Sequence, residues 1–282
     1  MEHWILKFTN WVLFTSLFTA FCATGLCMST ERLVSGGIPA FINPLHLLVF
    51  GATLAVYNTH ILVKKPTPER TELYAWTQRN KYWLYFFLMA GSAGCIASLF
   101  FMPTGVIIAC VVMGLFAFGY SLPLLPFKKL KRMRDVGIIK ILVLASVWTT
   151  VTTILPVLYL HKQISSYPYE FFIRLIFISI LCIAFDVRDI EADSRANVNT
   201  VPVLIGVKKS YKVMNIGIVL FILLGSVQYL RIFHVEQFVG IFITALVTKW
   251  VLDYVRDHPT DRAYMGLVDG LMLLYAALAL LH

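Results

Sequence analysis

Long apolar stretches constrain this chain more than any other feature, because a helix that crosses a bilayer needs about 20 predominantly apolar residues. Hydrophobic residues make up 59% of the 282 positions and charged residues only 14%, whereas about a quarter of a soluble domain is charged. We predict nine spans, at about 8–28, 44–63, 82–101, 105–122, 137–160, 168–185, 211–230, 234–252 and 263–281. The expected fold is all-α and polytopic, with residues 1–282 forming a single transmembrane domain.

Lysine and arginine are distributed unevenly between the loops, and this asymmetry predicts the orientation of the chain. Basic residues gather in loops 64–81, 123–140 and 186–212 and, as Arg256 and Arg262, in the last loop of the same set, whereas the alternate loops hold only Arg32, Lys162 and Arg231. We therefore expect a cytoplasmic N-terminus and an outer C-terminus. Short loops and the lack of a targeting signal favour a bacterial inner membrane, and no soluble basic fold is predicted that would bind nucleic acid.

An acidic run, Asp186-Val-Arg-Asp189-Ile-Glu-Ala-Asp193, follows the sixth span. On a helix, its three aspartates share one face at positions i, i+3 and i+7, where they repel one another unless a cation lies between them. Oxygen ligands of this kind suit Mg2+, which completes its coordination with water and phosphate oxygens. The run therefore predicts a site for Mg2+ and a diphosphate, in which Arg188 and Arg195 offset carboxylate charge or bind phosphate.

Two other cytoplasmic stretches are candidates for the same site. Residues 119–132 contain Tyr120 and several lysines, among them Lys128, and a lysine can bind phosphate as a point charge. The positive-inside pattern alone would also explain these lysines. The second span closes with Asn58 and His60; the asparagine amide is suited to orient a metal-bound water or phosphate, whereas the histidine is more simply a satisfied interfacial group.

The five cysteines all lie inside apolar spans and none shows C-x-x-C spacing. Small thiols in lipid or between packed helices need no partner. We therefore predict that they serve as packing residues. They are Cys22, Cys27, Cys95, Cys110 and Cys182.

Taken together, these motifs resemble the UbiA superfamily of intramembrane prenyltransferases. The resemblance rests on the order of two motifs in a chain with these spans: Tyr120-Ser121-x-Pro123 followed by lysines, and the acidic run followed by Arg195, Thr200-Val-Pro-Val203 and Gly206. It implies nine helices around a central cavity and a Mg2+-bound isoprenyl diphosphate between two acidic motifs. It also implies that ionisation of the carbon–oxygen bond gives an allylic cation, which an acceptor then attacks.

The chain departs from that family in the first of the two acidic motifs. The family pattern is N-D-x-x-D-x-x-x-D at the end of the second helix. Here Asn58 matches the asparagine, but Thr59, Leu62 and Pro66 stand where aspartates are expected. The loss should weaken or remove one metal of a two-metal clamp, and Lys64 and Lys65 would supply part of the missing positive charge.

The sequence therefore predicts a membrane enzyme that moves an isoprenyl group from its diphosphate to a lipophilic or aromatic acceptor. Asp186, Asp189 and Asp193 would hold Mg2+ with help from Asn58; the expected diphosphate contacts are Tyr120, Lys128, Arg188, Arg195 and Lys64. The acceptor remains open between a quinone precursor, a porphyrin-type ring, a carotenoid and a glycerol phosphate lipid. Two alternatives also remain: a UbiA-type terpene cyclase, and a non-catalytic relative that binds lipid or assembles with protein partners in a membrane complex.

Overall fold

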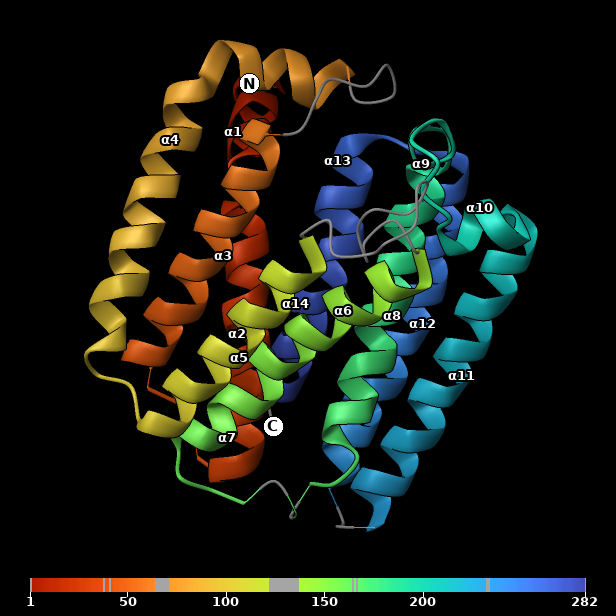
Figure 1. Cartoon of the computed structure of the whole chain (residues 1–282). Coiled ribbons are helices and arrows are strands. Elements are labelled where there is room, and N and C mark those ends of the chain that lie inside the picture. The colour runs from red at the N-terminus through yellow and green to blue at the C-terminus, as the bar shows by residue number, and fades with distance from the viewer. Residues whose placement is uncertain are drawn as a thin grey trace. The chain divides into compact units, whose positions relative to one another are not determined.

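The computed structural model describes residues 2–37, 39–40, 42–63, 71–121, 137–163, 165, 167–231 and 234–281. Within these ranges the chain forms helices and no strand (Figure 1). This confirms the predicted all-α fold. The helices divide into two compact units, Met1–Met102 with Asp253–His282 and Pro103–Leu252, called here the first and the second unit.

The first unit begins with a helix that is broken rather than straight. Helix α1 (Glu2–Phe14) and helix α2 (Leu17–Ser35) meet at an angle of 61°. Ser16, between them, has φ 61°, the left-handed conformation that non-glycine residues rarely adopt. The predicted span 8–28 is therefore divided between two helices, and the second continues to Ser35.

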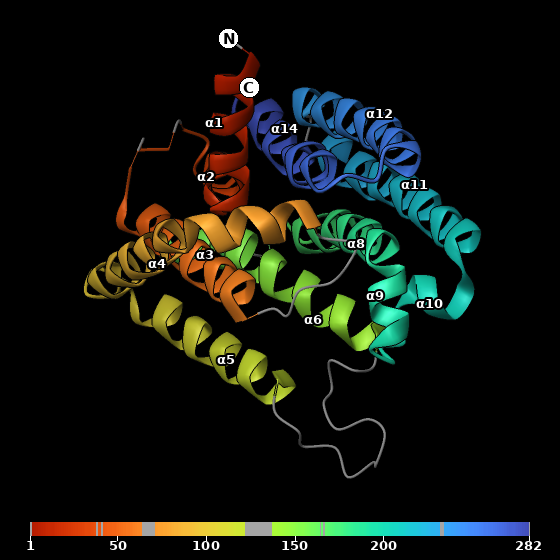
Figure 2. The ribbon, with the colours of Figure 1, turned by 90° about the horizontal axis from the view of Figure 1, so that it is seen from above.

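The rest of the first unit contains two long helices that pack unusually closely. Helices α3 (Pro44–Val63) and α4 (Thr71–Leu99) lie side by side in Figures 1 and 2. A Cβ atom at Gly51 would lie 2.6 Å from the carbonyl oxygen of Gly91, and one at Gly91 would lie 2.7 Å from that of Gly51. Only glycine permits this approach, a common form of helix packing in membranes. The C-terminal segment of this unit comprises α13 (Asp261–Ala263), a π-helical turn η5 (Tyr264–Val268) and α14 (Asp269–Leu280).

The second unit holds the helix that carries the acidic run. Helix α8 (Glu170–Arg188) packs against α6 (Gly137–Thr149) and α11 (Val207–Arg231). Figure 2 shows the short α9 (Ile190–Arg195) continuing from the end of α8. The remaining elements are α5 (Thr104–Ser121), η3 (Thr150–Ile154), α7 (Leu155–Tyr159), α10 (Val201–Ile205) and α12 (Val235–Asp257), which belongs to this unit up to Leu252.

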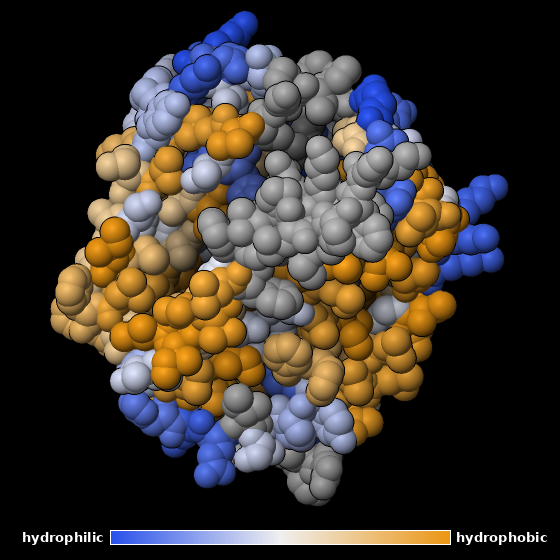
Figure 3. Space-filling model, viewed as in Figure 1, coloured by the Kyte–Doolittle hydropathy of each residue, from blue (hydrophilic) through white to orange (hydrophobic). Residues whose placement is uncertain are grey.

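Several helices are long and apolar enough to cross a bilayer. By length and composition the described residues contain six such helices, or seven if the bent pair α1–α2 counts as one span. Helix α8 is not among them, and it carries Glu170, Arg174, Asp186 and Arg188. Apolar side chains cover much of the surface seen in Figure 3. The polytopic membrane fold is thus confirmed, while nine spans, their orientation and a single domain remain predictions.

Candidate functional site

The acidic run lies where α8 ends and α9 begins. Asp189 leaves the helical conformation, with φ −90° and ψ 8°, so the predicted continuous stripe is interrupted at its central residue. The turn is nevertheless kept, because the Asp189 amide donates to the Phe185 carbonyl at 3.1 Å and the Asp193 amide donates to the Asp189 carbonyl at 2.9 Å. The carboxylates of Asp186 and Asp193 consequently remain close enough to share a partner.

That shared partner is Lys140, which belongs to helix α6. Its Nζ atom lies 2.7 Å from Asp186 Oδ1 and 3.3 Å from Asp193 Oδ2. The Lys140 side chain is 28% exposed, against 6% for Asp186 and 16% for Asp193. An ion pair at this depth is screened far less than one on an open surface. Lys140 thus places a positive charge between two of the carboxylates.

Lys140 was not predicted as a site residue. It is the last residue of the basic loop 123–140, where the positive-inside rule by itself accounts for lysines. One signal was present: Lys140 lies inside the first turn of an apolar helix, Gly137–Thr149. An ionisable group in a membrane segment is costly and generally requires a partner. The identity of that partner depends on how α6 packs against α8, which the sequence pattern does not contain.

The third carboxylate, that of Asp189, has a different cation. Arg188 Nε donates to Asp189 Oδ1 at 2.9 Å, and a second guanidinium nitrogen donates to Oδ2 at 3.4 Å. The guanidinium also lies 5.0 Å from the centre of the Phe185 ring, within the range of a cation–π contact. Arg188 therefore offsets carboxylate charge, one of the two roles predicted for it.

The donor set at this cluster fits a hard divalent cation. Asp186 Oδ2 is buried and has no hydrogen-bond partner among the described residues, although buried carboxylate oxygens are normally satisfied. Asp186 and Asp193 already converge on one ammonium group. Mg2+ requires oxygen ligands of this type and keeps several positions for water and phosphate. Asp186 and Asp193, with Asp189 beside them, are thus the residues suited to hold it.

Arg195 lies at the exposed end of α9. Beyond it lies α10, which follows Thr200 and has Pro202 in its first turn. The helix ends at Ile205, and the next residue, Gly206, has φ 80°. Proline near the start and a glycine with positive φ just past the end are typical helix boundaries. The predicted contact of Arg195 with phosphate remains a prediction.

Asn58 belongs to the first unit and is completely buried, at 0% exposure. Its Nδ2 atom donates to the Thr15 carbonyl at 3.0 Å and to the Leu54 carbonyl at 2.9 Å. Thr15 precedes the break between α1 and α2, so the amide fastens α3 to that break. Its Oδ1 atom is buried without a hydrogen-bond partner in the described part of the chain. The predicted help of Asn58 to a metal remains a prediction that rests on this oxygen.

Three further predicted contacts cannot be placed. Lys128 and Lys64, together with Lys65, lie outside the described residues. Tyr120 falls in the last turn of α5, but its side chain also lies outside the described part.

Comparison with known proteins decides the family. A model of the UbiA prenyltransferase family matches residues 75–275, which is most of the chain. The chain belongs to this family. The resemblance predicted from the motifs is thereby confirmed, and membership supports a membrane prenyltransferase as the class of activity.

Other comparisons place this UbiA-family chain at some distance from characterised proteins. A solved structure of a digeranylgeranylglyceryl phosphate synthase matches with a TM-score of 0.53 and 17% sequence identity, over 100% of each chain. At this identity the likeness shows the fold alone. No curated protein matches the sequence.

The limits of the family match are themselves informative. The matched residues 75–275 contain the acidic run and Lys140, whereas Asn58 and the rest of α3 precede the match. The family match therefore covers the acidic run and begins after the segment that was compared with the first motif.

Proposed function

We propose that this UbiA-family protein is a membrane prenyltransferase that uses the end of α8 to bind an isoprenyl diphosphate with Mg2+. The observation that carries the proposal is the convergence of Asp186 and Asp193 on one cation, with a buried Asp186 oxygen left over. Carboxylates cluster in this way at a membrane boundary at considerable cost. Binding of Mg2+ together with a diphosphate would offset that cost.

In this proposal each residue of the cluster has a distinct task. Asp186, Asp189 and Asp193 hold the cation, and Mg2+ there supplies charge stabilisation for the departing diphosphate. Lys140 keeps the carboxylates together before the cation binds, and its ammonium group then donates hydrogen bonds to diphosphate oxygens. Arg188 balances Asp189, so that the three carboxylates, with Lys140 and Arg188 beside them, carry a single net negative charge before substrate binds.

The reaction proposed is prenyl transfer. The bond between the allylic carbon and the diphosphate oxygen breaks, and the electron pair leaves with the diphosphate. A nucleophilic atom of the acceptor then forms a bond to the allylic carbon and loses its proton. The protein contributes by positioning the two reactants and by stabilising charge on the leaving group, which is commonly the largest catalytic effect.

We further propose that a single Mg2+ suffices in this chain. Thr59, Leu62 and Pro66 offer no carboxylate at the first motif. Lys140 already contributes one fixed positive charge at the second, and Lys64 and Lys65 remain candidates for another. Tyr120, Lys128 and Arg195 are the other proposed diphosphate contacts. Fixed ammonium groups would thus replace part of the charge that a second metal supplies in the family.

The acceptor is proposed to be a lipophilic or aromatic compound in the membrane. The matching structure belongs to a digeranylgeranylglyceryl phosphate synthase, so a glycerol phosphate lipid is the first acceptor to test. Quinone precursors, porphyrin-type rings and carotenoids come next. We propose that the site faces the cytoplasm in a bacterial inner membrane, which the excess of lysine and arginine in the loops of that side supports.

The test uses the purified full-length protein in lipid nanodiscs with Mg2+. Labelled geranyl, farnesyl and geranylgeranyl diphosphates are supplied together with a bacterial lipid extract. We expect Mg2+-dependent diphosphate release and a labelled, organic-soluble adduct, both lost in Asp186→Asn. Asp257→Asn is the matched control, because the Asp257 carboxylate is 64% exposed and pairs with Arg256 far along the chain from α8.

Three results would point elsewhere. A labelled hydrocarbon formed without acceptor would favour the cyclase. Tight diphosphate binding without any release would favour the non-catalytic relative. Release that persists in Asp186→Asn would remove the acidic run from the proposal altogether.

A further inference from the structure

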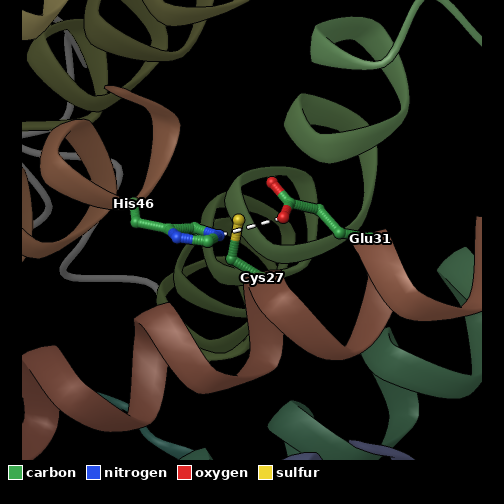
Figure 4. Close-up of side chains that lie close together, drawn as sticks. All are labelled: Cys27, Glu31 and His46. Atoms are coloured by element: carbon green, nitrogen blue, oxygen red, sulfur yellow. Dashed lines mark hydrogen bonds and ion pairs between the residues drawn. The ribbon is translucent and has the colours of Figure 1, made fainter. Parts of the chain in front are cut away.

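A second cluster of metal-ligand side chains lies in the first unit. Cys27 and Glu31 are four residues apart in α2, so they occupy one face of the helix. His46 is the third residue of α3, which packs against α2. Figure 4 shows the three side chains pointing toward one another. The predicted packing role of Cys27 does not account for these neighbours.

The geometry of the cluster is close to that of a metal site. One potential ligand atom from each residue lies within 4.8 Å of the other two, and His46 Nε2 is 3.0 Å from Glu31 Oε2. Cys27 is 0% exposed, Glu31 2% and His46 3%. A cation held by all three would need only small side-chain movements, because metal–ligand bonds to nitrogen, oxygen and sulfur are about 2.0–2.3 Å long.

Asn43 holds this arrangement in place from the start of α3. Its Nδ2 atom donates to both Glu31 carboxylate oxygens, at 3.1 and 3.2 Å. Its Oδ1 atom accepts from the His46 backbone amide at 2.9 Å, which caps the helix. Hydrogen bonds that orient metal ligands are a regular feature of metal sites. His46 Nδ1, by contrast, has no hydrogen-bond partner among the described residues. Nε2 is therefore the imidazole nitrogen that faces Glu31 and would bind the metal.

We propose that Cys27, Glu31 and His46 form a zinc site that fastens α2 to α3. Sulfur, nitrogen and oxygen ligands together favour a transition metal such as Zn2+ over Mg2+. A thiolate, a carboxylate and a neutral imidazole around Zn2+ have zero net charge, which suits a buried, low-dielectric position. Water occupies the fourth position. This site is separate from the acidic run of α8 and does not depend on the function proposed there.

Zinc bound at this position stabilises the fold, because its ligands are brought together only when α2 packs on α3. The site also explains why α2 continues past the predicted span limit at residue 28. Glu31 lies in that extension, where His46 and Asn43 contact its buried carboxylate. A clamp of this kind sets the spacing of the two helices at one end.

The experiment uses chelator-treated, full-length protein in detergent, with excess Mg2+ to saturate oxygen-only sites. Zn2+ is titrated while the melting temperature is followed, and Co2+ is used as a spectroscopic probe of thiolate ligation. We expect one equivalent of Zn2+ to raise the melting temperature and Co2+ to give a thiolate charge-transfer band. Both effects should be lost in Cys27→Ser. In His46→Gln they should require a metal concentration at least tenfold higher. Cys22→Ser is the matched control, because Cys22 is equally buried in α2 and should leave both effects intact.

A second measurement covers variants that fail to fold. In the unmutated protein, Zn2+ should slow the alkylation of Cys27 by N-ethylmaleimide under mild denaturation more than that of Cys22, as resolved by peptide mass spectrometry. The proposal is overturned if folded, unmutated protein shows neither a Zn2+-dependent melting shift nor a Co2+–thiolate band. Retention of the band in Cys27→Ser, or equal protection of both thiols, would overturn it as well.

Discussion

The end of α8 and the end of α3 are the two segments where the resemblance to the family predicts acidic motifs, and in this chain their chemistry differs. The end of α8 keeps three aspartates, two of which share Lys140 while the third pairs with Arg188. The end of α3 carries Asn58 and no aspartate, and the Asn58 amide nitrogen donates to the carbonyls of Thr15 and Leu54. The α8 segment is charged and paired with cations, whereas Asn58 at the end of α3 is uncharged and buried in the packing.

Asn58 and Asp186 differ in what their side chains contact. Asn58 satisfies a backbone carbonyl next to the break between α1 and α2, so it has a structural reason to be there even without aspartates behind it. Asp186 pairs with Lys140 through one carboxylate oxygen, but its other oxygen is buried without a hydrogen-bond partner among the described residues, which is a cost. Substitutions at α8 should therefore affect cation and diphosphate binding, whereas substitutions at α3 should affect stability.

The largest effect is expected for Asp186→Asn. The substitution keeps the shape of the side chain and removes the negative charge that binds the cation. Diphosphate release should fall by about 10²–10³-fold, the usual result of removing one main charge-stabilising group. Steady-state kinetics with Mg2+ and labelled prenyl diphosphate measure it, with Asp257→Asn expected to stay within twofold of the unmutated protein. Equal rates in both variants would contradict the role given to α8.

The next effect is expected for Lys140→Met. Removing one member of a buried ion pair leaves uncompensated charge and costs about 3–5 kcal/mol in a fully buried case, and the partial exposure of Lys140 favours the lower value. Part of this loss should be restored by Mg2+, and half-saturation by Mg2+ should occur at a lower concentration because the competing ammonium is gone. Chemical denaturation with and without Mg2+ checks both effects. Lys140→Arg keeps the charge and should lose little stability. If Mg2+ does not change the stability of Lys140→Met, Lys140 is not part of the metal site.

A smaller effect, on stability alone, is expected for Asn58→Leu. The carbonyls of Thr15 and Leu54 lose a buried donor, at a cost of about 1–3 kcal/mol. Turnover per folded molecule and its Mg2+ dependence should not change. The control is Thr59→Val, because the Thr59 hydroxyl donates to the Ala55 carbonyl of its own helix at an exposed position. Normal stability with lost turnover would instead favour the catalytic help predicted for Asn58.

The smallest effect is expected for Arg195→Gln. Arg195 is exposed at the end of α9, and interactions of exposed charges contribute little to stability, so its loss should change the melting temperature only slightly. Loss of one charged hydrogen bond to phosphate, about 1.5 kcal/mol or more, should raise KM for the prenyl diphosphate about tenfold. Comparison of KM and kcat decides the point, since an unchanged KM would leave Arg195 without a part in binding.

Much of the fold follows from the sequence, because apolar span length and basic-loop asymmetry are direct consequences of a bilayer environment. The acidic run could also be predicted from the sequence, since its residue types and spacing indicate its chemistry. The role of Lys140 could not be predicted, because it depends on contact between α6 and α8. The break at Ser16 was also hidden: no glycine or proline marks it, and the left-handed turn is held by tertiary contacts such as that of Asn58 with Thr15.

Direct measurement of cation binding tests the central contrast most simply. Mn2+ replaces Mg2+ as a paramagnetic probe, and the protein is first loaded with Zn2+ and supplied with an unreactive prenyl thiodiphosphate. Electron paramagnetic resonance should show one bound Mn2+ in the unmutated protein and in Asn58→Leu, and none in Asp186→Asn. Mn2+ binding that survives Asp186→Asn but disappears in Asn58→Leu would contradict the account, because it would place the cation at α3 rather than at α8.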